Sequence, residues 1–293
     1  MQLDNTRIAV RERNLLETFD LALHVVREFW RPWLACSLLA ILPLAVLNYA
    51  LIGWMADIDY AEDYIPFRFY WTMSLLVYLE APLASSLVIG FLGPAVFMER
   101  PSVRQVLREV MQFAPQLTLC QLLLRGILPA WLLLLTLDRY DVNIFVEVFL
   151  LPGLAIYATV VRALRPNISE IILLEKNPLR AKNPNQLTIG KRSAHLHDPS
   201  ASDLFGRWIG SAMLCALLVG IVFTTLVVAV GVLFSQWLPG WYTAEFLYPA
   251  ALWTVAAFMS VVRFLNYLDL RIRHEGWEVE LLMRAEGMRL AGK

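Results

Sequence analysis

The sequence predicts an all-α fold, namely a polytopic membrane helix bundle with about six transmembrane helices and additional amphipathic cytoplasmic helices. Of the 293 residues, 58% are hydrophobic and only 17% are charged, whereas soluble domains are about half apolar and about a quarter charged. Six apolar stretches are long enough to cross a hydrocarbon core, which takes about 20 helical residues. Lysine and arginine are concentrated between alternate stretches. This composition, with a formal net charge of zero, argues against a disordered chain, a nucleic-acid binder and an ordinary cytosolic enzyme.

Residues 1–32 are expected to form a cytoplasmic, amphipathic N-terminal helix. Leu15, Phe19 and Leu23 recur at helical spacing on one face, and charged residues occupy another. Charged residues near the start of the chain leave no apolar core for a signal peptide. The helix is therefore expected to lie at the inner membrane surface and to lead into the first span.

Residues 33–266 are expected to form the membrane domain. Each span is predicted to be helical, because an isolated span must satisfy its backbone hydrogen bonds internally. Prolines in four spans remove backbone hydrogen bonds and are expected to kink the helices. These prolines are Pro43, Pro82, Pro129 and Pro152. The expected spans are 33–54, 69–97, 113–137, 143–164, 208–237 and 245–266.

The distribution of basic residues predicts the orientation of the bundle. Twenty-two of the 25 lysines and arginines fall on one side of the predicted spans, whereas the other side has only Arg68 and Arg139. In membrane proteins the more basic side is the cytoplasmic one. The sequence therefore predicts a multi-pass protein of the bacterial inner (cytoplasmic) membrane with both termini in the cytoplasm.

Two further cytoplasmic segments follow from this topology. The inner loop, 165–207, is interrupted by prolines and is expected to be the least regular part of the chain. Residues 267–293 are expected to continue the last span as a cytoplasmic helix, with i,i+4 charge pairs such as Asp269 and Arg273.

Basic residues on the cytoplasmic segments form a candidate face for membrane lipids or for membrane-protein or cytoplasmic partners. The alternative is that they lie on ordinary solvated helix faces. The residues of this candidate basic face are Arg104, Arg108, Lys191, Arg192, Arg271 and Arg273.

Two charged residues, Glu80 and Arg125, lie near the middle of the second and third spans. A charge at this depth costs about 3 kcal/mol or more unless it is paired or hydrated. The two spans are antiparallel neighbours in sequence, so we predict a Glu80–Arg125 ion pair, with Gln121 as a hydrogen-bond partner one turn before Arg125. Two interpretations stay open: a buried pair that fixes helix packing, and a substrate or proton site.

The chain has none of the sequence motifs that would indicate a familiar catalytic chemistry. A phosphate-binding glycine loop, a dinucleotide fingerprint, a zinc-protease motif and a nucleophile elbow are all missing. His195 and His197 are close in sequence, but two histidines at i,i+2 in a loop are a weak indication of a metal. We therefore expect no catalytic residues, no cofactor, no metal, no enzyme activity and no nucleic-acid partner.

Two stretches of the C-terminal half resemble known bacterial membrane proteins. The first, Glu175–Gly210, has an acidic residue, a base-rich Arg-Ser segment and an aromatic membrane entry. It is similar to the membrane domain of glycerophosphoryl diester phosphodiesterases. The second, Tyr267–Leu281, resembles the ending of a family of bacterial polytopic inner-membrane proteins without an assigned function. The resemblance implies the membrane fold and the location, but no enzyme activity and no catalytic residues, because the phosphodiesterase catalytic domain is absent from this sequence.

These observations favour a non-enzymatic scaffold that organises partners or lipids at the cytoplasmic face of the membrane. The alternative is a small transporter or lipid-handling protein that uses the level of Glu80 and Arg125 as its site. The two hypotheses differ in what should surround these residues. A sealed pair favours the scaffold, whereas a cavity that reaches either face favours transport or lipid handling.

Overall fold

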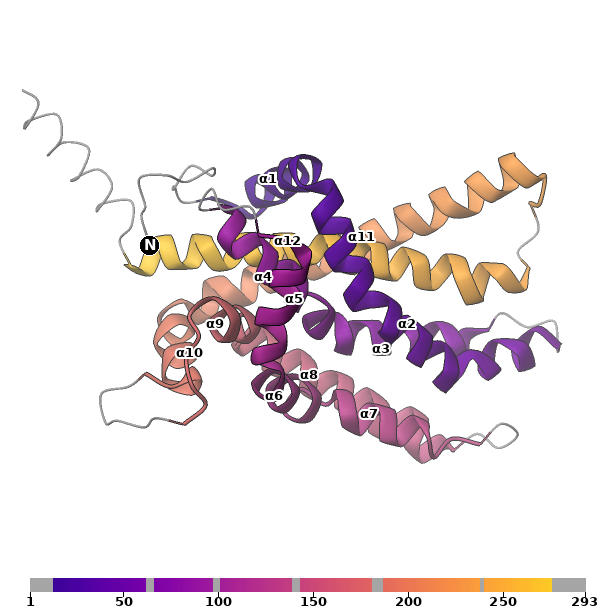
Figure 1. Ribbon diagram of the computed structural model, residues 1–293. Coiled ribbons are helices and arrows are strands. Elements are labelled where there is room, and N and C mark those ends of the chain that lie inside the picture. Colours follow the sequence, from indigo (N-terminus) through magenta and orange to yellow (C-terminus); the bar gives the residue numbers. More distant parts are fainter. Residues whose placement is uncertain are drawn as a thin grey trace, which may run out of the picture.

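The computed structural model describes residues 13–61, 66–96, 101–138, 143–180, 187–237 and 240–275. Every regular element in these ranges is a helix, so the predicted all-α bundle is confirmed (Figure 1). Five helices in the same ranges are long and apolar enough to cross a membrane, or six if one bent pair is counted as a single span. These helices are those of a multi-pass membrane protein.

Each expected span coincides with helical structure. The first is α2 (Trp30–Ala61), and the second is α3 (Phe67–Ala84) followed by α4 (Ser86–Val96). The helices of the fifth and sixth spans extend past the expected limits, since α11 (Ala201–Phe234) begins before 208 and α12 (Tyr248–Glu275) ends after 266. The third span consists of α6 (Ala114–Leu117), η1 (Thr118–Leu123) and α7 (Ile127–Leu134), and the fourth of η2 (Phe145–Leu150) and α8 (Leu151–Leu164). The fifth span is part of α11, and the sixth consists of η4 (Thr243–Leu247) and α12.

The third expected span is broken rather than straight. Its two halves are bent by 59° between Leu123 and Ile127. Gly126 has a φ of 82°, which glycine adopts without steric cost, and Pro129 has no N–H to donate to the carbonyl of Arg125. The bend therefore places Arg125 at an interruption of the helix. By contrast, α2 and α3 each continue past the proline that they contain.

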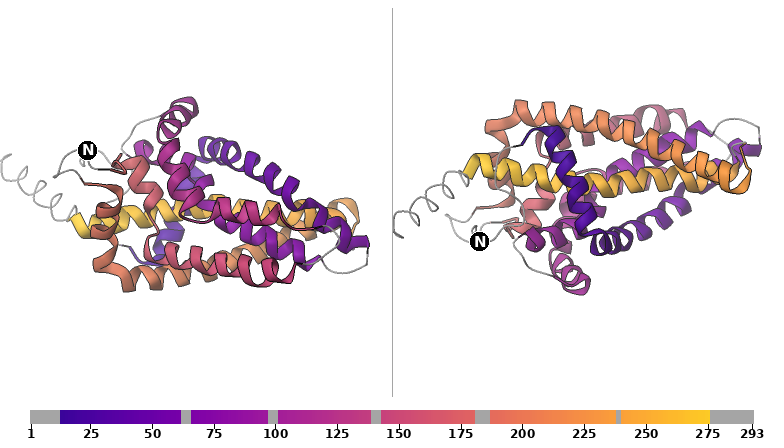
Figure 2. Two further views of the ribbon diagram at one scale, coloured as in Figure 1. Left: turned by 90° about the horizontal axis from the view of Figure 1, so that it is seen from below. Right: turned by 90° about the horizontal axis from the view of Figure 1, so that it is seen from above.

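Shorter helices gather at one end of the bundle, which we call the α1 end (Figure 2). They are α1 (Leu15–Glu28), α9 (Ile168–Leu174), α10 (Ile189–His197) and the single turn η3 (Asp198–Ser200). The predicted topology places the α1 end in the cytoplasm. The predicted C-terminal helix is described only as far as Glu275, and the rest of 267–293 lies outside the described residues.

The expected N-terminal helix is α1, which begins at Leu15 and buries only part of the predicted face; residues 1–12 of the expected segment 1–32 lie outside the described residues. Asn14 Oδ1 accepts a hydrogen bond from the Glu17 amide at 2.8 Å, and the Glu17 carboxylate accepts one from the Asn14 amide, which forms a capping box. Phe19 packs on Phe258 of α12, with ring centroids 6.0 Å apart. Leu23, expected on the same face, remains 59% exposed. Only part of the predicted apolar face is therefore covered by the bundle.

The inner loop 165–207 is more regular than expected, because α9, α10 and η3 lie within it. The start of α10 is fixed by Thr188, whose hydroxyl accepts a hydrogen bond from the Lys191 amide at 3.4 Å. A threonine in this position is a favoured helix N-cap. Outside the loop, α5 (Val103–Gln112) packs on α4 through Val106 and Val110.

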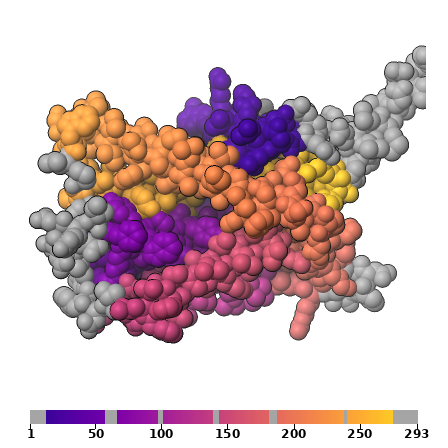
Figure 3. Space-filling view, turned by 180° about the vertical axis from the view of Figure 1, so that it is seen from behind, coloured from indigo at the N-terminus to yellow at the C-terminus, as the bar shows by residue number. Residues whose placement is uncertain are grey.

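The second span is the centre of the bundle, and the fifth is its most exposed member. In the most apolar part of each span, 78% of residues are buried for α3–α4 but only 6% for α11. Figure 3 shows α3 recessed between α11 and α8. Since α11 carries exposed apolar residues such as Met213 and Leu217, its outer face has the character of a lipid-facing surface.

Candidate functional site: an arginine-lined cavity

Glu80 and Arg125 do not form the predicted ion pair. Glu80 is fully buried, and its carboxylate accepts hydrogen bonds from Asn48 Nδ2 and Trp131 Nε1, both at 2.8 Å. Arg125 instead donates from Nη2 to the carbonyl oxygen of Arg165 at 2.8 Å. The prediction is wrong because the bend in the third span brings Arg125 to the C-terminal end of α8. Glu80 links α2, α3 and α7, which is a packing role.

Gln121 is also separate from Arg125. Its Nε2 donates to Ser169 Oγ of α9 at 2.6 Å, and both side chains are buried. The three residues predicted as one intramembrane site therefore take part in three different polar contacts. Of the three, Arg125 lines the cavity described below, and Glu80 and Gln121 do not line that cavity.

The guanidinium of Arg125 lies at the C-terminal end of α8. The last turn of a helix has carbonyl groups without intrahelical partners and carries the negative end of the helix dipole, which favours a cation. Arg125 Nη2 lies 2.8 Å from the Arg165 carbonyl oxygen and 3.4 Å from that of Pro166. The side chain is only 1% exposed, and its Nε has no hydrogen-bond partner. These carbonyls stabilise the guanidinium, but they do not neutralise its charge.

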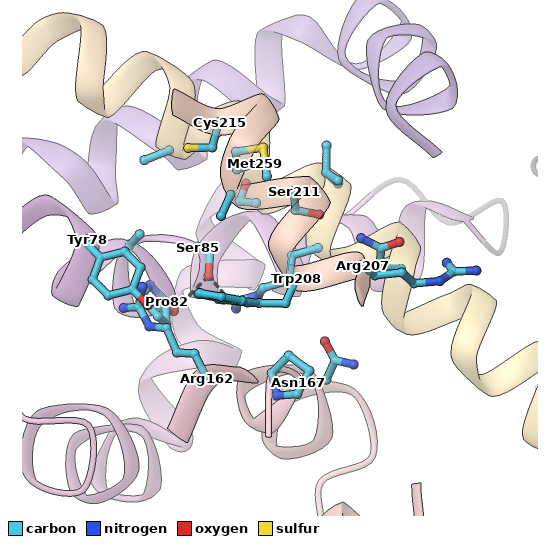
Figure 4. Close-up of a pocket in the computed structure, with 18 of the residues that line it drawn as sticks. Tyr78, Pro82, Ser85, Arg162, Asn167, Arg207, Trp208, Ser211, Cys215 and Met259 are labelled. Atoms are coloured by element: carbon cyan, nitrogen blue, oxygen red, sulfur yellow. Dashed lines mark hydrogen bonds between the residues drawn. The ribbon is translucent and has the colours of Figure 1, made fainter. Parts of the chain in front are cut away.

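The cavity has a volume of about 300 Å³ and lies between α3, α8, α11 and α12 (Figure 4). This volume is at the lower end of the range for small-molecule sites, about 300–1,000 Å³. Its most distinctive feature is the number of cationic side chains in the wall. The arginines that line it are Arg125, Arg162, Arg207, Arg263 and Arg273.

Three of these arginines, Arg125, Arg162 and Arg263, form what we call the arginine cluster. Arg162 donates to the Leu79 carbonyl oxygen at 2.8 Å, and its guanidinium lies 4.0 Å from the ring centroid of Tyr78. Arg263 Nε lies 2.7 Å from Glu170 Oε1.

Glu170 is the one carboxylate with an ion pair to the cluster among the residues that the structure describes. The three guanidinium groups line the same cavity and carry like charges. The cluster therefore has two more positive charges than negative ones, in a part of the bundle where burial makes such an excess costly.

The other two arginines both have aspartate partners, although Arg273 Nε has no hydrogen-bond partner. Arg207 contacts Asp269 at 3.0 Å and Asp203 at 3.1 Å. Arg273 contacts Asp203 at 3.0 Å and Asp269 at 2.9 Å. This four-residue network, which we call the double-Asp network, joins the start of α11 to the end of α12 at the α1 end. Because two arginines meet two aspartates, it adds no net charge to the cavity.

The wall changes from polar to apolar with distance from the α1 end. On α11 the lining runs from Arg207 to Val219, a length of about 18 Å at 1.5 Å per residue. On the antiparallel α12 it runs from Arg273 at the same polar end to Leu252. Trp208 extends from α11 into the cavity between these ends (Figure 4). The cavity is therefore amphipathic, with its cationic part nearer the α1 end.

The candidate basic face does not form one surface. Arg192 and Arg271 are directed at Glu175: Arg192 Nε lies 2.6 Å from the carboxylate, and Arg271 Nε lies 3.8 Å away. Tyr267 also donates to Glu175, at 2.8 Å. Burial raises the pKa of Glu175, but the hydrogen bonds from Arg192 and Tyr267 and the nearby guanidinium charges outweigh burial, so its pKa lies below its ordinary value. This cluster ties α10 and α12 to the loop after α9.

The remaining members of the candidate basic face have different environments. Arg273 belongs to the double-Asp network, whereas Arg104, Arg108 and Lys191 are exposed. The two histidines singled out in the sequence also differ: His195 is exposed, and His197 is buried and lies 3.1 Å from Ser193 Oγ. The i,i+2 spacing therefore does not bring these histidines together.

Sequence reasoning missed most of the arginine cluster. Arg162 and Arg263 lie inside the expected spans 143–164 and 245–266, but near the ends predicted to be cytoplasmic, so they counted as cytoplasmic bases. Their position inside the apolar limits was the available signal. Glu170 lies in a segment expected to be irregular, and no sequence pattern connects it to Arg263.

Comparison with known protein families, curated proteins and solved structures finds no match. The resemblance expected from the two C-terminal stretches therefore stays a prediction. The interpretation of the cavity rests on its geometry and charge.

Proposed function

We propose that the chain is a non-enzymatic lipid-handling protein of the bacterial inner membrane that binds an anionic amphiphile in the arginine-lined cavity. The observation that carries this proposal is the uncompensated positive charge of the arginine cluster. Arg125 and Arg162 have no ion pair with a carboxylate in the described ranges, yet both line a cavity. An anion in the cavity would supply the missing charge, and arginine binds phosphate and carboxylate groups with paired hydrogen bonds.

The apolar part of the cavity supports an amphiphile rather than a small soluble anion. Its far end is lined by apolar side chains, including Val219 and Leu252. α11 and α8 leave α3 recessed between them on one side of the molecule (Figure 3). An acyl chain in this recess would lie against mainly apolar side chains of α3 and α11, such as Val77, Ala212 and Val219.

The proposed orientation places the cationic part of the cavity at the level of the cytoplasmic leaflet. The arginine cluster and the double-Asp network lie towards the α1 end, and the predicted topology puts this end in the cytoplasm. A lipid of the inner leaflet has its headgroup at this level and its chains directed to the bilayer centre. This is the same direction in which the cavity wall becomes apolar.

A scaffold role at the cytoplasmic face remains a second candidate, because α5 has the surface of an interfacial helix. Arg104 and Arg108 are exposed on it, and Leu107 and Met111 are 37% and 63% exposed beside them. Such a combination of basic and apolar side chains suits an anionic membrane surface. It is compatible with lipid binding in the cavity, which lies elsewhere.

The proposal is tested by thermal unfolding of delipidated protein in detergent, with and without added lipid. A ligand that binds the folded state raises the unfolding temperature. We expect phosphatidylglycerol to raise it and phosphatidylcholine to have little effect. The double variant Arg125→Gln/Arg162→Gln should lose most of this shift, whereas Arg27→Gln, which removes an exposed charge from α1, should keep it. Equal shifts with the anionic and the zwitterionic lipid would contradict the proposal.

A further inference from the structure

The charge balance of the cavity points to a particular class of headgroup. We infer that the cavity binds a phosphate monoester, a headgroup that carries two negative charges, with the phosphate on Arg125 and Arg162. The inference rests on the proposed function, and it adds the chemistry of the ligand.

The first argument is the size of the charge excess. The double-Asp network is neutral, and the Arg263–Glu170 pair is neutral, so the uncompensated charge comes from Arg125 and Arg162. A phosphate diester has one negative charge and would leave one guanidinium without a counter-charge. A phosphate monoester approaches two negative charges above its second ionisation, at about pH 6. Only the monoester matches the excess.

The second argument is the supply of hydrogen-bond donors. Arg125 and Arg162 each use only Nη2 for hydrogen bonds to the described residues, so Nη1 of each is a donor without a partner there. Asn167 is 2% exposed, lines the cavity, and forms no side-chain hydrogen bond with other described residues. Ser85 is different, since its hydroxyl already accepts a hydrogen bond from Arg263 Nη2 at 2.8 Å. Three terminal oxygens of a monoester offer more acceptor positions to these donors than the two free oxygens of a diester.

The third argument is the volume. A cavity of about 300 Å³ is small for a ligand site. It has room for a compact headgroup and the first part of one chain, but not for a bulky headgroup with two complete chains. Trp208 already extends into it (Figure 4). The rest of the ligand must therefore leave through the recess beside α3. A bare phosphate on glycerol is the smallest headgroup that provides the charge.

The test compares four probes on the wild-type protein at pH 8: phosphatidate, phosphatidylglycerol, phosphatidylcholine and inorganic phosphate, with affinity taken from concentration-dependent shifts in unfolding temperature. We expect phosphatidate to bind at least tenfold more tightly than phosphatidylglycerol. At pH 5, where the monoester has one charge, this preference should fall to about threefold or less. Because this comparison uses only wild-type protein, it does not depend on whether a variant folds.

The source of the phosphate is decided by the fourth probe. If inorganic phosphate stabilises the protein as well as phosphatidate does, the ligand is a soluble phosphate monoester. If inorganic phosphate competes with phosphatidate only at far higher concentration, the ligand is a lipid. Arg162→Gln should reduce the preference for phosphatidate at least tenfold, and Arg27→Gln should not change it.

Equal affinity for phosphatidate and phosphatidylglycerol at both pH values would overturn this inference and leave the proposed function standing. Equal affinity for all three lipids would overturn both.

Discussion

The contacts of Glu80 lead to a prediction about energetic coupling. Its carboxylate accepts one hydrogen bond from Asn48 and one from Trp131, and Glu80 and Arg125 share no partner. Glu80→Gln replaces one acceptor oxygen by an NH2 group, so one of the two donors loses its partner in a buried place. Such a loss costs about 1–3 kcal/mol in soluble proteins, and hydrogen bonds between membrane helices average about 0.6 kcal/mol with a maximum near 1.7. We expect a cost of about 1–2 kcal/mol.

Double-mutant cycles separate the two candidate partners. For Glu80→Gln with Trp131→Phe we expect a coupling of about 1 kcal/mol, because each change removes one side of the same hydrogen bond. For Glu80→Gln with Arg125→Gln the two costs should add to within about 0.5 kcal/mol. The free energy of unfolding would be measured by reversible denaturation in mixed micelles. If the Glu80/Arg125 double variant were more stable than either single variant, the two residues would form a pair after all, and the assignment of Glu80 to helix packing would be refuted.

Three further predictions concern other parts of the bundle. Gly126→Ala should lower the free energy of unfolding by about 1–2 kcal/mol, because alanine is strained at a φ of 82°. The control Gly153→Ala, with nothing within 4 Å of the new Cβ, should raise the free energy of unfolding by less than about 1 kcal/mol. Glu175 has a lowered pKa in the folded state, so its stabilising contribution is present above the unfolded pKa of about 4.3 and is lost as the pH falls through the folded value. The difference in free energy of unfolding between wild type and Glu175→Gln should therefore be largest above about pH 5 and shrink in more acidic solution. A constant difference from pH 7 to pH 3 would contradict this prediction. Arg273→Gln should lower the free energy of unfolding by about 1–3 kcal/mol, because it removes a partner of the buried Asp269. The control Arg104→Gln should change the free energy of unfolding by less than about 0.5 kcal/mol. Similar costs at both positions would count against the distinction between paired and exposed bases.

The positions of the spans were predictable because a bilayer imposes one requirement on every span. About 20 apolar residues and a self-satisfied backbone are needed to cross it, and this requirement is visible in the composition of each stretch. The limits were less predictable. α12 continues past 266 because its last turns are held by contacts such as Arg271 with Glu175, which depend on a distant segment.

The partners of the buried polar residues were not predictable, because they depend on the direction of one bend. Equal depth in adjacent spans suggested that Glu80 and Arg125 would meet. The left-handed conformation of Gly126 instead turns the chain where Arg125 lies, and the unpaired carbonyls at the end of α8 accept the guanidinium. Pro129 indicated that a bend would occur, but not its direction.

The arginine cluster was hidden for a related reason. Hydropathy and the positive-inside pattern assign a basic residue near the end of a span to the cytoplasm. Arg162 and Arg263 fit that rule by position, yet both side chains line an internal cavity. Only the packing of α3, α8, α11 and α12 around one volume reveals that they share it.

Photocrosslinking with a phosphatidate that carries a diazirine in its acyl chain tests most directly whether an amphiphile occupies the cavity. Cys215 and Val219 line the cavity on α11, whereas Met213 and Leu217 of the same helix are 70% and 59% exposed on its outer face. Peptide mapping should find adducts on Cys215 and Val219 that unlabelled phosphatidate suppresses, and any adducts on Met213 and Leu217 should be unaffected by the competitor. Adducts confined to the outer face, or equally reduced on both faces, would contradict the binding of an anionic amphiphile in this cavity.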